Sequence, residues 1–174
     1  MPQLINHKDL EILADVYMKE GQEDLVNHRN KIAIKKMQKA LKLLKKAKST
    51  ERYVRNLNVM GVVYTSLGDE QKAFECYLEA LANAEVIKCS YLKALCYINV
   101  GSCYQKLERH HEAIKYFKDA EIELSNPDVK KQEKYQMWTM VNYLNLRDAY
   151  GEIKGTEEEL KPYSIDDAKT LIFV

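Results

Sequence analysis

Three of the four cysteines, Cys89, Cys96 and Cys103, are spaced seven residues apart, so on one helix their thiols would share a face. Clustered thiols bind metals or exchange disulfides, which makes this spacing the first chemical possibility in the sequence. Successive members would lie about 10 Å apart by helical rise, whereas zinc holds each sulfur at about 2.3 Å. No two cysteines form a CxxC pair. We therefore expect small buried residues here, with no metal site and no disulfide framework.

Two histidines and a carboxylate are adjacent at His110, His111 and Glu112. They fall in an expected turn between helices, where an exposed loop explains them without a metal ion. The patterns GxGxxG, GxxxxGK[ST], HExxH and GxSxG, which mark phosphate-binding loops, metalloproteases and serine hydrolases, are absent from the sequence. The sequence thus predicts a protein that is not an enzyme and that needs no cofactor.

Basic residues are concentrated between Arg29 and Arg55. This segment has eleven lysines and arginines and one acid, whereas the whole chain has a net charge of +1. Four lysines at helical spacing form what we call the basic stripe: Lys35, Lys39, Lys42 and Lys46. Such a stripe attracts nucleic acid, an anionic membrane or an acidic partner. It lacks interleaved aromatic residues for base stacking, which argues against nucleic acid. A nucleic-acid-associated or anionic-partner-binding protein that uses the basic helix 29–55 is the alternative function.

The amino-acid composition indicates that the residues described above lie on helices. Of 174 residues, 46% are apolar and 30% charged, with only 6 glycines and 3 prolines to interrupt helices. No run reaches the roughly 18 to 20 apolar residues that span a bilayer. Several acidic residues lie among the first 30 residues, where a signal peptide would have an apolar stretch. We therefore expect no membrane span and a reducing, cytoplasmic location.

A pattern of apolar residues recurs with a period of 40. Each copy has a large, a medium, a small and an aromatic residue at i, i+3, i+4 and i+7, the spacing of one helix face. Twelve residues after the small one, a second face follows with alanine, an aromatic residue and alanine. The two clear copies are Leu57, Met60, Gly61, Tyr64, Ala73, Tyr77 and Ala80, then Tyr97, Val100, Gly101, Tyr104, Ala113, Phe117 and Ala120. Each copy predicts a pair of antiparallel helices with small residues where the backbones come closest.

Two weaker copies flank these. The earlier one aligns Ala14 with Gly61, places a turn at Gly21 and is seven residues longer before its second face at Ala33, Met37 and Ala40. The later one is predicted at Met137, Met140, Val141 and Leu144, with a diverged second half. The expected helices are 7–20, 24–48, 52–67, 70–87, 90–107, 111–124 and 129–153, with short helices after Thr156 and Ser164.

The pattern of small and aromatic positions resembles the tetratricopeptide repeat over residues 7–153. The resemblance implies an all-α fold, an α-α superhelix of about three helix hairpins with a diverged C-terminal region. We expect a single domain, 1–174, with repeats at about 7–48, 52–87 and 90–124, a diverged fourth at 129–161 and a C-terminal segment at 162–174. The period of 40 is similar to longer-repeat members that capture peptides or regulatory partners.

The resemblance also implies the function and the place of binding. Family members are non-catalytic interaction modules whose partner lies in a concave groove lined by the first helix of each pair. Such modules often precede signalling outputs, so we expect a regulatory or scaffold part of a larger signalling protein. From the apolar chain end 170–174 we expect either the amino-terminal part of a longer polypeptide or a segment that docks on a partner. Self-association through an open end of the array is a third possibility. By offset, the groove residues are Arg55, Asn58, Val62, Ile98, Asn99, Ser102, Gln105, Tyr135, Trp138, Asn142 and Asn145. Their amides suit a peptide backbone, and Tyr135 and Trp138 suit an aromatic anchor.

Overall fold

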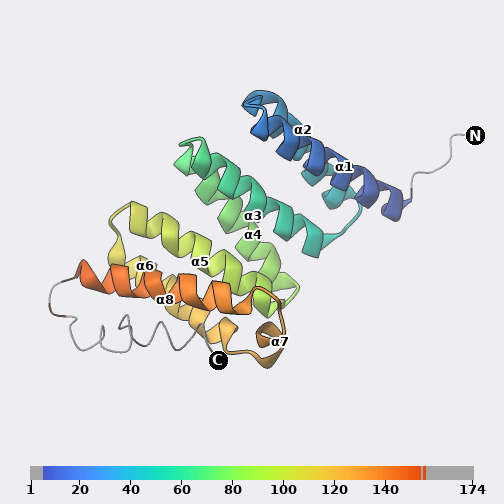
Figure 1. The fold of residues 1–174 in the computed structure, drawn as a ribbon. Coiled ribbons are helices and arrows are strands. Elements are labelled where there is room, and N and C mark those ends of the chain that lie inside the picture. The colour runs from blue at the N-terminus through green and yellow to red at the C-terminus, as the bar shows by residue number, and fades with distance from the viewer. Residues whose placement is uncertain (1–5, 154, 156–174) are drawn as a thin grey trace, which may run out of the picture. The chain divides into compact units, whose positions relative to one another are not determined.

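The structure is a computed structural model that describes residues 6–153 and 155, and these residues form eight α-helices and no strand (Figure 1). The helices are α1 (His7–Val26), α2 (Asn30–Lys46), α3 (Thr50–Ser66), α4 (Glu70–Val86), α5 (Ser90–Lys106), α6 (His110–Leu124), α7 (Pro127–Lys130) and α8 (Tyr135–Gly151).

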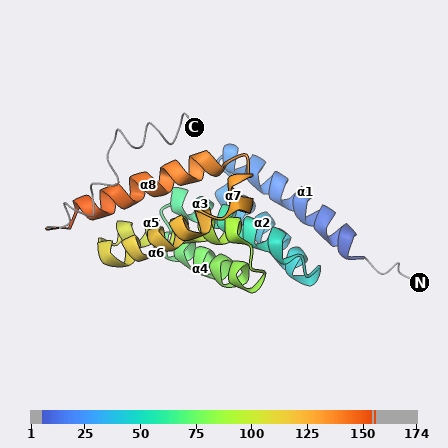
Figure 2. The same ribbon diagram turned by 90° about the horizontal axis from the view of Figure 1, so that it is seen from below.

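The described helices belong to two compact units, residues 1–83 and 84–174. In the first unit, α1 lies along α2, and α3 packs next to α2. In the second unit, α5 lies along α6, and α8 packs against α6 and also contacts α5 (Figures 1 and 2). Each unit therefore buries its own apolar side chains between neighbouring helices, which is the main source of stability for short helices.

Glycine lies where the two helices of a hairpin come closest. A β-carbon added to Gly61 would lie 2.3 Å from Cε1 of Tyr77, and one added to Gly101 would lie 2.5 Å from Cε1 of Phe117. Because these distances are far inside van der Waals contact, no larger residue fits without displacing the ring. The alanines expected beside them are all fully buried: Ala73, Ala80, Ala113 and Ala120. The prediction of small residues at the closest approach is confirmed.

The predicted turn at Gly21 is wrong. Helix α1 continues to Val26, and the chain turns at residues 27–29 before α2 begins. Gly21 is buried inside α1, and a β-carbon there would lie 2.6 Å from Cγ of Met37. Gly21 thus occupies the place of Gly61 one period earlier, a place that the sequence alignment assigns to Ala14. The 40-residue period holds through the first hairpin, which contains no seven-residue insertion.

Helices α1 to α5 end in one backbone motif that recurs every 20 residues. The second residue after each of these helices has a positive φ. The backbone N–H of the residue that follows it donates to the carbonyl five positions earlier, as Asp69 does to Tyr64 at 2.9 Å. This Schellman arrangement satisfies carbonyls that the helix end leaves open. The residues with positive φ are His28, Lys48, Gly68, Lys88 and Glu108. Only Gly68 is a glycine, so the sequence marks one of these five turns clearly.

The predicted helix 129–153 is divided into α7 and α8. The side chain of Asn126 accepts a hydrogen bond from the N–H of Asp128 (2.9 Å) and begins α7, with Pro127 in its first turn. Residues 131–134 are polar and exposed, so no apolar side chain anchors a continuous helix across them. The helices expected after Thr156 and Ser164 lie outside the described residues.

The predicted apolar face of the fourth copy is half right: Met140 and Leu144 pack against the buried cluster of α6 and α8, but the other two residues do not. Met137 and Val141 are 52% and 40% exposed. The buried face of α8 is rotated away from them and consists of Asn142, Tyr143, Leu146, Ala149 and Tyr150. The 40-residue register therefore ends after α6, where the polar segment 131–134 separates α8 from the preceding helices.

Candidate functional site

Helices α5 and α8 bring most of the predicted groove residues of the second unit together. The amide Nδ2 of Asn145 donates to Oγ of Ser102 at 3.3 Å, and that hydroxyl donates to the carbonyl of Ile98 at 2.8 Å. We call the half-buried polar and aromatic residues of these two helices the α5–α8 surface. Its members are Asn99, Ser102, Gln105, Tyr135, Trp138 and Asn145. The bond from Asn145 links the two helices, whereas the bond from Ser102 lies within α5.

Trp138 is held in place by a ring on α5. The rings of Tyr91 and Trp138 are stacked, with centroids 6.2 Å apart and planes 9° from parallel. Both rings, together with Tyr135, lie over a buried apolar cluster that includes Ile98 and Val129. Because one side of each ring packs on this cluster while the residue stays half-buried, Trp138 is a preordered aromatic side chain at the solvent boundary.

Three predicted groove residues are buried and are not part of this surface. Asn142 is 2% exposed and donates from Nδ2 to the carbonyl of Phe117 at 2.9 Å, which ties α8 to α6. Asn58 is 4% exposed and donates to the carbonyl of Val54 within its own helix at 3.1 Å. Ile98 is 4% exposed beneath the aromatic rings. The offset rule misplaced them because it describes helix faces and takes no account of how deeply each helix is packed.

The predicted residues of the first unit are more exposed. Arg55 is at the surface and forms an ion pair with Glu51, one helical turn earlier, at 3.0 Å. Val62 is 56% exposed. Both belong to α3, and they remain candidate contacts for a partner at the surface of that helix.

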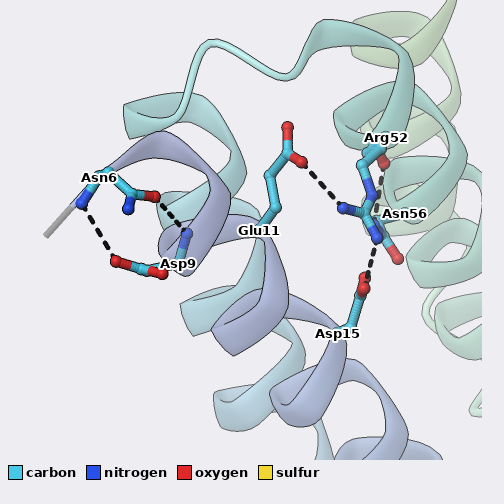
Figure 3. A network of polar contacts seen from close by, with 6 residues as sticks. All are labelled: Asn6, Asp9, Glu11, Asp15, Arg52 and Asn56. Atoms are coloured by element: carbon cyan, nitrogen blue, oxygen red, sulfur yellow. Dashed lines mark hydrogen bonds and ion pairs between the residues drawn. The ribbon is translucent and has the colours of Figure 1, made fainter.

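An arginine that the sequence analysis did not single out links α1 to α3. Arg52 on α3 reaches both Glu11 (3.1 Å) and Asp15 on α1, as Figure 3 shows. A hydrogen bond from Ser49, together with the Arg52 guanidinium, holds the pKa of Glu11 below its usual range. The one signal for this bridge is charge: Glu11 and Asp15 are one turn apart on an acidic helix that precedes a basic segment.

The basic stripe is a continuous exposed face of α2. Lys35, Lys39, Lys42 and Lys46 are all exposed, and Lys39 also lies over the ring of Tyr17 at 5.4 Å. Within the described part of the chain, none of these four lysines forms an ion pair. The stripe therefore keeps its positive charge available to an anionic partner.

Each unit also has a surface hollow. The one in the second unit, of about 240 Å³, lies beside the ring of Tyr91 and is lined further by Ser90, Asn126 and Val129 among others. The one in the first unit, of about 350 Å³, contains Lys45, Lys48 and Tyr53, whose hydroxyl donates to Glu79 at 2.6 Å. Burial raises the pKa of Tyr53 far above its usual value.

The described residues contain no cluster of three or more His, Cys, Asp or Glu side chains that would hold a metal ion. Cys96 and Cys103 are buried in α5, whereas Cys89 is half-buried at the residue before that helix. The three thiols thus do not share one helix. No helix in the described residues has the length and apolar character needed to cross a membrane.

Tyr91, whose ring supports Trp138 at the border of the α5–α8 surface, is a residue that the sequence did not indicate. It is seven residues before Ile98, the spacing of one helix face, but it lies outside the offsets that define the groove. Only the position of α8, which departs from the 40-residue register, brings Trp138 onto its ring.

Comparison with known proteins agrees with the helical-repeat pattern. Residues 53–121 match the family model described as tetratricopeptide repeat, and this segment contains both clear copies of the 40-residue pattern. These residues are therefore similar to the tetratricopeptide-repeat family, the family whose resemblance the sequence indicates. No curated protein matches the chain. Proteins of this family are in general interaction or scaffold modules.

Solved structures show the fold over nearly the whole chain. The crystal structure of BtubC (BKLC) from P. vanneervenii is similar to 95% of this chain with a TM-score of 0.75 and 19% sequence identity. The chain spans 65% of the length of that protein. The predicted fold class, an all-α helical-repeat fold of the α-α superhelix type, is confirmed.

Proposed function

We propose that the protein is a non-catalytic module that binds an extended protein or peptide segment on the α5–α8 surface, in a regulatory or scaffold role within a larger signalling protein. The observation that carries this proposal is the pairing of a preordered aromatic side chain, Trp138, with half-buried amides on both helices. The four cysteines are free thiols, which favours a reducing, cytoplasmic compartment.

The residue types fit an extended ligand. An asparagine or glutamine side chain donates and accepts hydrogen bonds at once, as a peptide backbone does, so Asn99, Gln105 and Asn145 match a ligand of any sequence. Aromatic side chains dominate binding energy because they bury a large area and lose little conformational freedom. The hollow beside Tyr91 is large enough for one ligand side chain next to the stacked rings. Specificity would come from that side chain, and orientation from the amides.

The test is selection of peptides from a displayed random library, followed by measurement of the dissociation constant by fluorescence anisotropy. We expect Trp138→Ala to raise the dissociation constant of selected peptides at least about tenfold. Gln105→Ala and Asn145→Ala should raise it by smaller factors without touching the apolar cluster. The matched control is Ile122→Ala on α6, where an apolar side chain is 68% exposed away from α8, and it should bind as the wild type does. Selected peptides that bind all three surface variants with unchanged affinity would refute the proposal.

A second candidate function rests on the unpaired lysines of α2. The basic stripe would bind an acidic protein segment or nucleic acid through charge, and such binding weakens steeply as salt is added. Replacement of Lys35, Lys39, Lys42 and Lys46 by glutamate would abolish it and would leave peptide binding at the α5–α8 surface unchanged. The two functions are therefore separable by salt and by these variants.

A further inference from the structure

Helix α1 has an apolar strip on the side opposite its buried face. Ile12, Leu13 and Val16 are 54%, 40% and 45% exposed, whereas Leu10, Ala14 and Met18 face the interior of the hairpin. Among the described residues, no element covers this strip. An exposed apolar strip bordered by charges is typical of a protein interface.

The charges around the strip are arranged symmetrically about Ala14. Lys8 and Glu20 lie six residues on either side of it, and Asp9 and Lys19 lie five residues on either side. Each pair has one cation and one anion. Lys8, Asp9 and Lys19 are exposed on the outer face of the helix with Ile12 and Val16, whereas Glu20 lies at the flank of the helix, where it binds Lys36 of α2. Ile12 and Val16 lie two residues on either side of the same centre.

This charge pattern is complementary to the same pattern on a second α1 helix that runs in the opposite direction. If a second α1 lies antiparallel across the first, with a two-fold axis level with Ala14, Ile12 of each copy meets Val16 of the other. Asp9 of each copy then faces Lys19 of the other, so this charged contact joins opposite charges, whereas Lys8 and Glu20 lie on opposite flanks of α1 and do not meet. A parallel arrangement would instead place like charges together. A two-fold dimer presents the same patch from both subunits, as this arrangement does.

The side chains of Asp9 and Lys19 are available for this contact. Lys19 is exposed and forms no ion pair within the described residues. Asp9 accepts from the backbone N–H of Asn6 at 3.4 Å and lies on the side of α1 away from Arg52 (Figure 3).

We propose that two copies of this chain associate through the outer faces of their α1 helices, packed antiparallel about Ala14. The contact is one helix against one helix, so it is small, and association is concentration-dependent rather than permanent. It leaves the α5–α8 surface unused. Two binding surfaces for the same partner would thus be joined in one dimer, which raises the apparent affinity for a partner with two binding segments. The proposal does not depend on the proposed function.

Sedimentation velocity of the full chain over a concentration series from about 1 µM to about 500 µM tests this proposal. The wild type should pass from monomer to dimer within the series. Ile12→Glu places a charge against the apolar Val16 of the other copy and should weaken dimerisation at least about tenfold. Ile122→Glu, a similar change at an exposed isoleucine on α6, should leave it unchanged. A wild type that stays monomeric throughout, or a dimer that Ile12→Glu does not weaken, would overturn the proposal.

A charge-swap pair identifies the antiparallel register. Lys19→Glu alone brings two acids together at each Asp9 contact, and Asp9→Lys alone brings two lysines together, so each variant should be mainly monomeric. When the two variants are mixed, both contacts of a mixed dimer join opposite charges again, and a heterodimer should form. Circular dichroism melting of each variant first establishes that it is folded. Dimerisation of either single variant at wild-type strength, or the absence of a heterodimer from the mixture, would contradict the register.

Discussion

Asp24 and Lys36 form an ion pair (Oδ2 to Nζ, 2.9 Å) in the hairpin of α1 and α2. The equivalent positions in the hairpin of α5 and α6 hold Tyr104 and Tyr116, whose rings are stacked. The two sites are related by two periods of 40 residues. A third pair of equivalent positions, Arg29 and Arg109, holds an arginine in both hairpins. Arg29 binds Asp24 at 2.6 Å, and Arg109 lies over the ring of Tyr104 at 4.8 Å. The repeat thus keeps its backbone geometry while an ion pair replaces aromatic stacking.

The ion pair makes the stability of the first hairpin depend on pH. The Lys36 ammonium that donates to Asp24, together with Arg29, holds the pKa of Asp24 below its usual value, although burial opposes this. The carboxylate therefore stabilises the fold fully above the usual aspartate pKa, and the stabilisation is lost as pH falls through the lowered pKa of the folded state. We expect Asp24→Asn to lower the melting temperature clearly at pH 7, and the difference from wild type to shrink near pH 2.

Thermal melts at both pH values check this expectation. Asp148→Asn is the control, because Asp148 is an exposed carboxylate that pairs with its chain neighbour Arg147 and such pairs contribute little. A melting-temperature loss for Asp24→Asn that is as large at the acidic pH as at pH 7 would show that the charge of Asp24 is not what stabilises the hairpin.

The contact between Gly61 and Tyr77 predicts a strong size dependence at that glycine. Gly61→Ala should lower the free energy of unfolding by about 1–3 kcal/mol because the added methyl group displaces the ring, and Gly61→Leu should lower it more. The measurement is urea unfolding followed by circular dichroism. Gly151→Ala provides the matched control, since a β-carbon there meets no atom within 4 Å. Equal unfolding free energies for Gly61→Ala and Gly151→Ala would refute the close-packing account.

The left-handed residue at the end of α2 offers a stabilising substitution. Lys48 has a φ of 55°, which is unfavourable for a side chain with a β-carbon. Lys48→Gly should raise the free energy of unfolding by about 0.5–1 kcal/mol, because glycine adopts this conformation without strain. Lys46→Gly, two residues earlier in the last turn of the helix, should instead lower it by up to about 1 kcal/mol. Urea titrations that place both variants on the same side of wild type would contradict this assignment.

The two asparagines of α8 have different roles that stability measurements separate. Asn142 is buried and holds the carbonyl of Phe117, so Asn142→Ala should lower the free energy of unfolding by about 1–3 kcal/mol. Asn145 is half-buried and binds the hydroxyl of Ser102, so Asn145→Ala should cost less stability and act mainly on ligand binding. Similar unfolding free energies for the two variants would show that burial does not distinguish them.

The hairpin pairing could be predicted because size alternation is visible in sequence. Gly61 with Tyr77 and Gly101 with Phe117 repeat at fixed offsets, and both pairs are in contact. The first turn could not be predicted, because its left-handed residue is His28, whereas Gly21 serves helix packing. Glycine thus has two structural uses here, and sequence alone does not separate them.

The candidate site could be predicted in part. Asn99, Ser102 and Gln105 lie on one face of α5, as their spacing indicates. The stacking of Trp138 on Tyr91 depends on where α8 packs, and that helix leaves the 40-residue register after the polar segment 131–134. Burial of Asn142 has the same origin, because its side chain faces α6 only in the observed rotation of α8.

The proposal that a partner segment binds on the α5–α8 surface is tested most directly by chemical-shift mapping of the isotope-labelled protein with a selected peptide. The account predicts that the largest shifts occur at the side-chain amides of Asn99, Gln105 and Asn145 and at the indole N–H of Trp138. Shifts confined to the basic stripe of α2, with these four side chains unchanged, would contradict it.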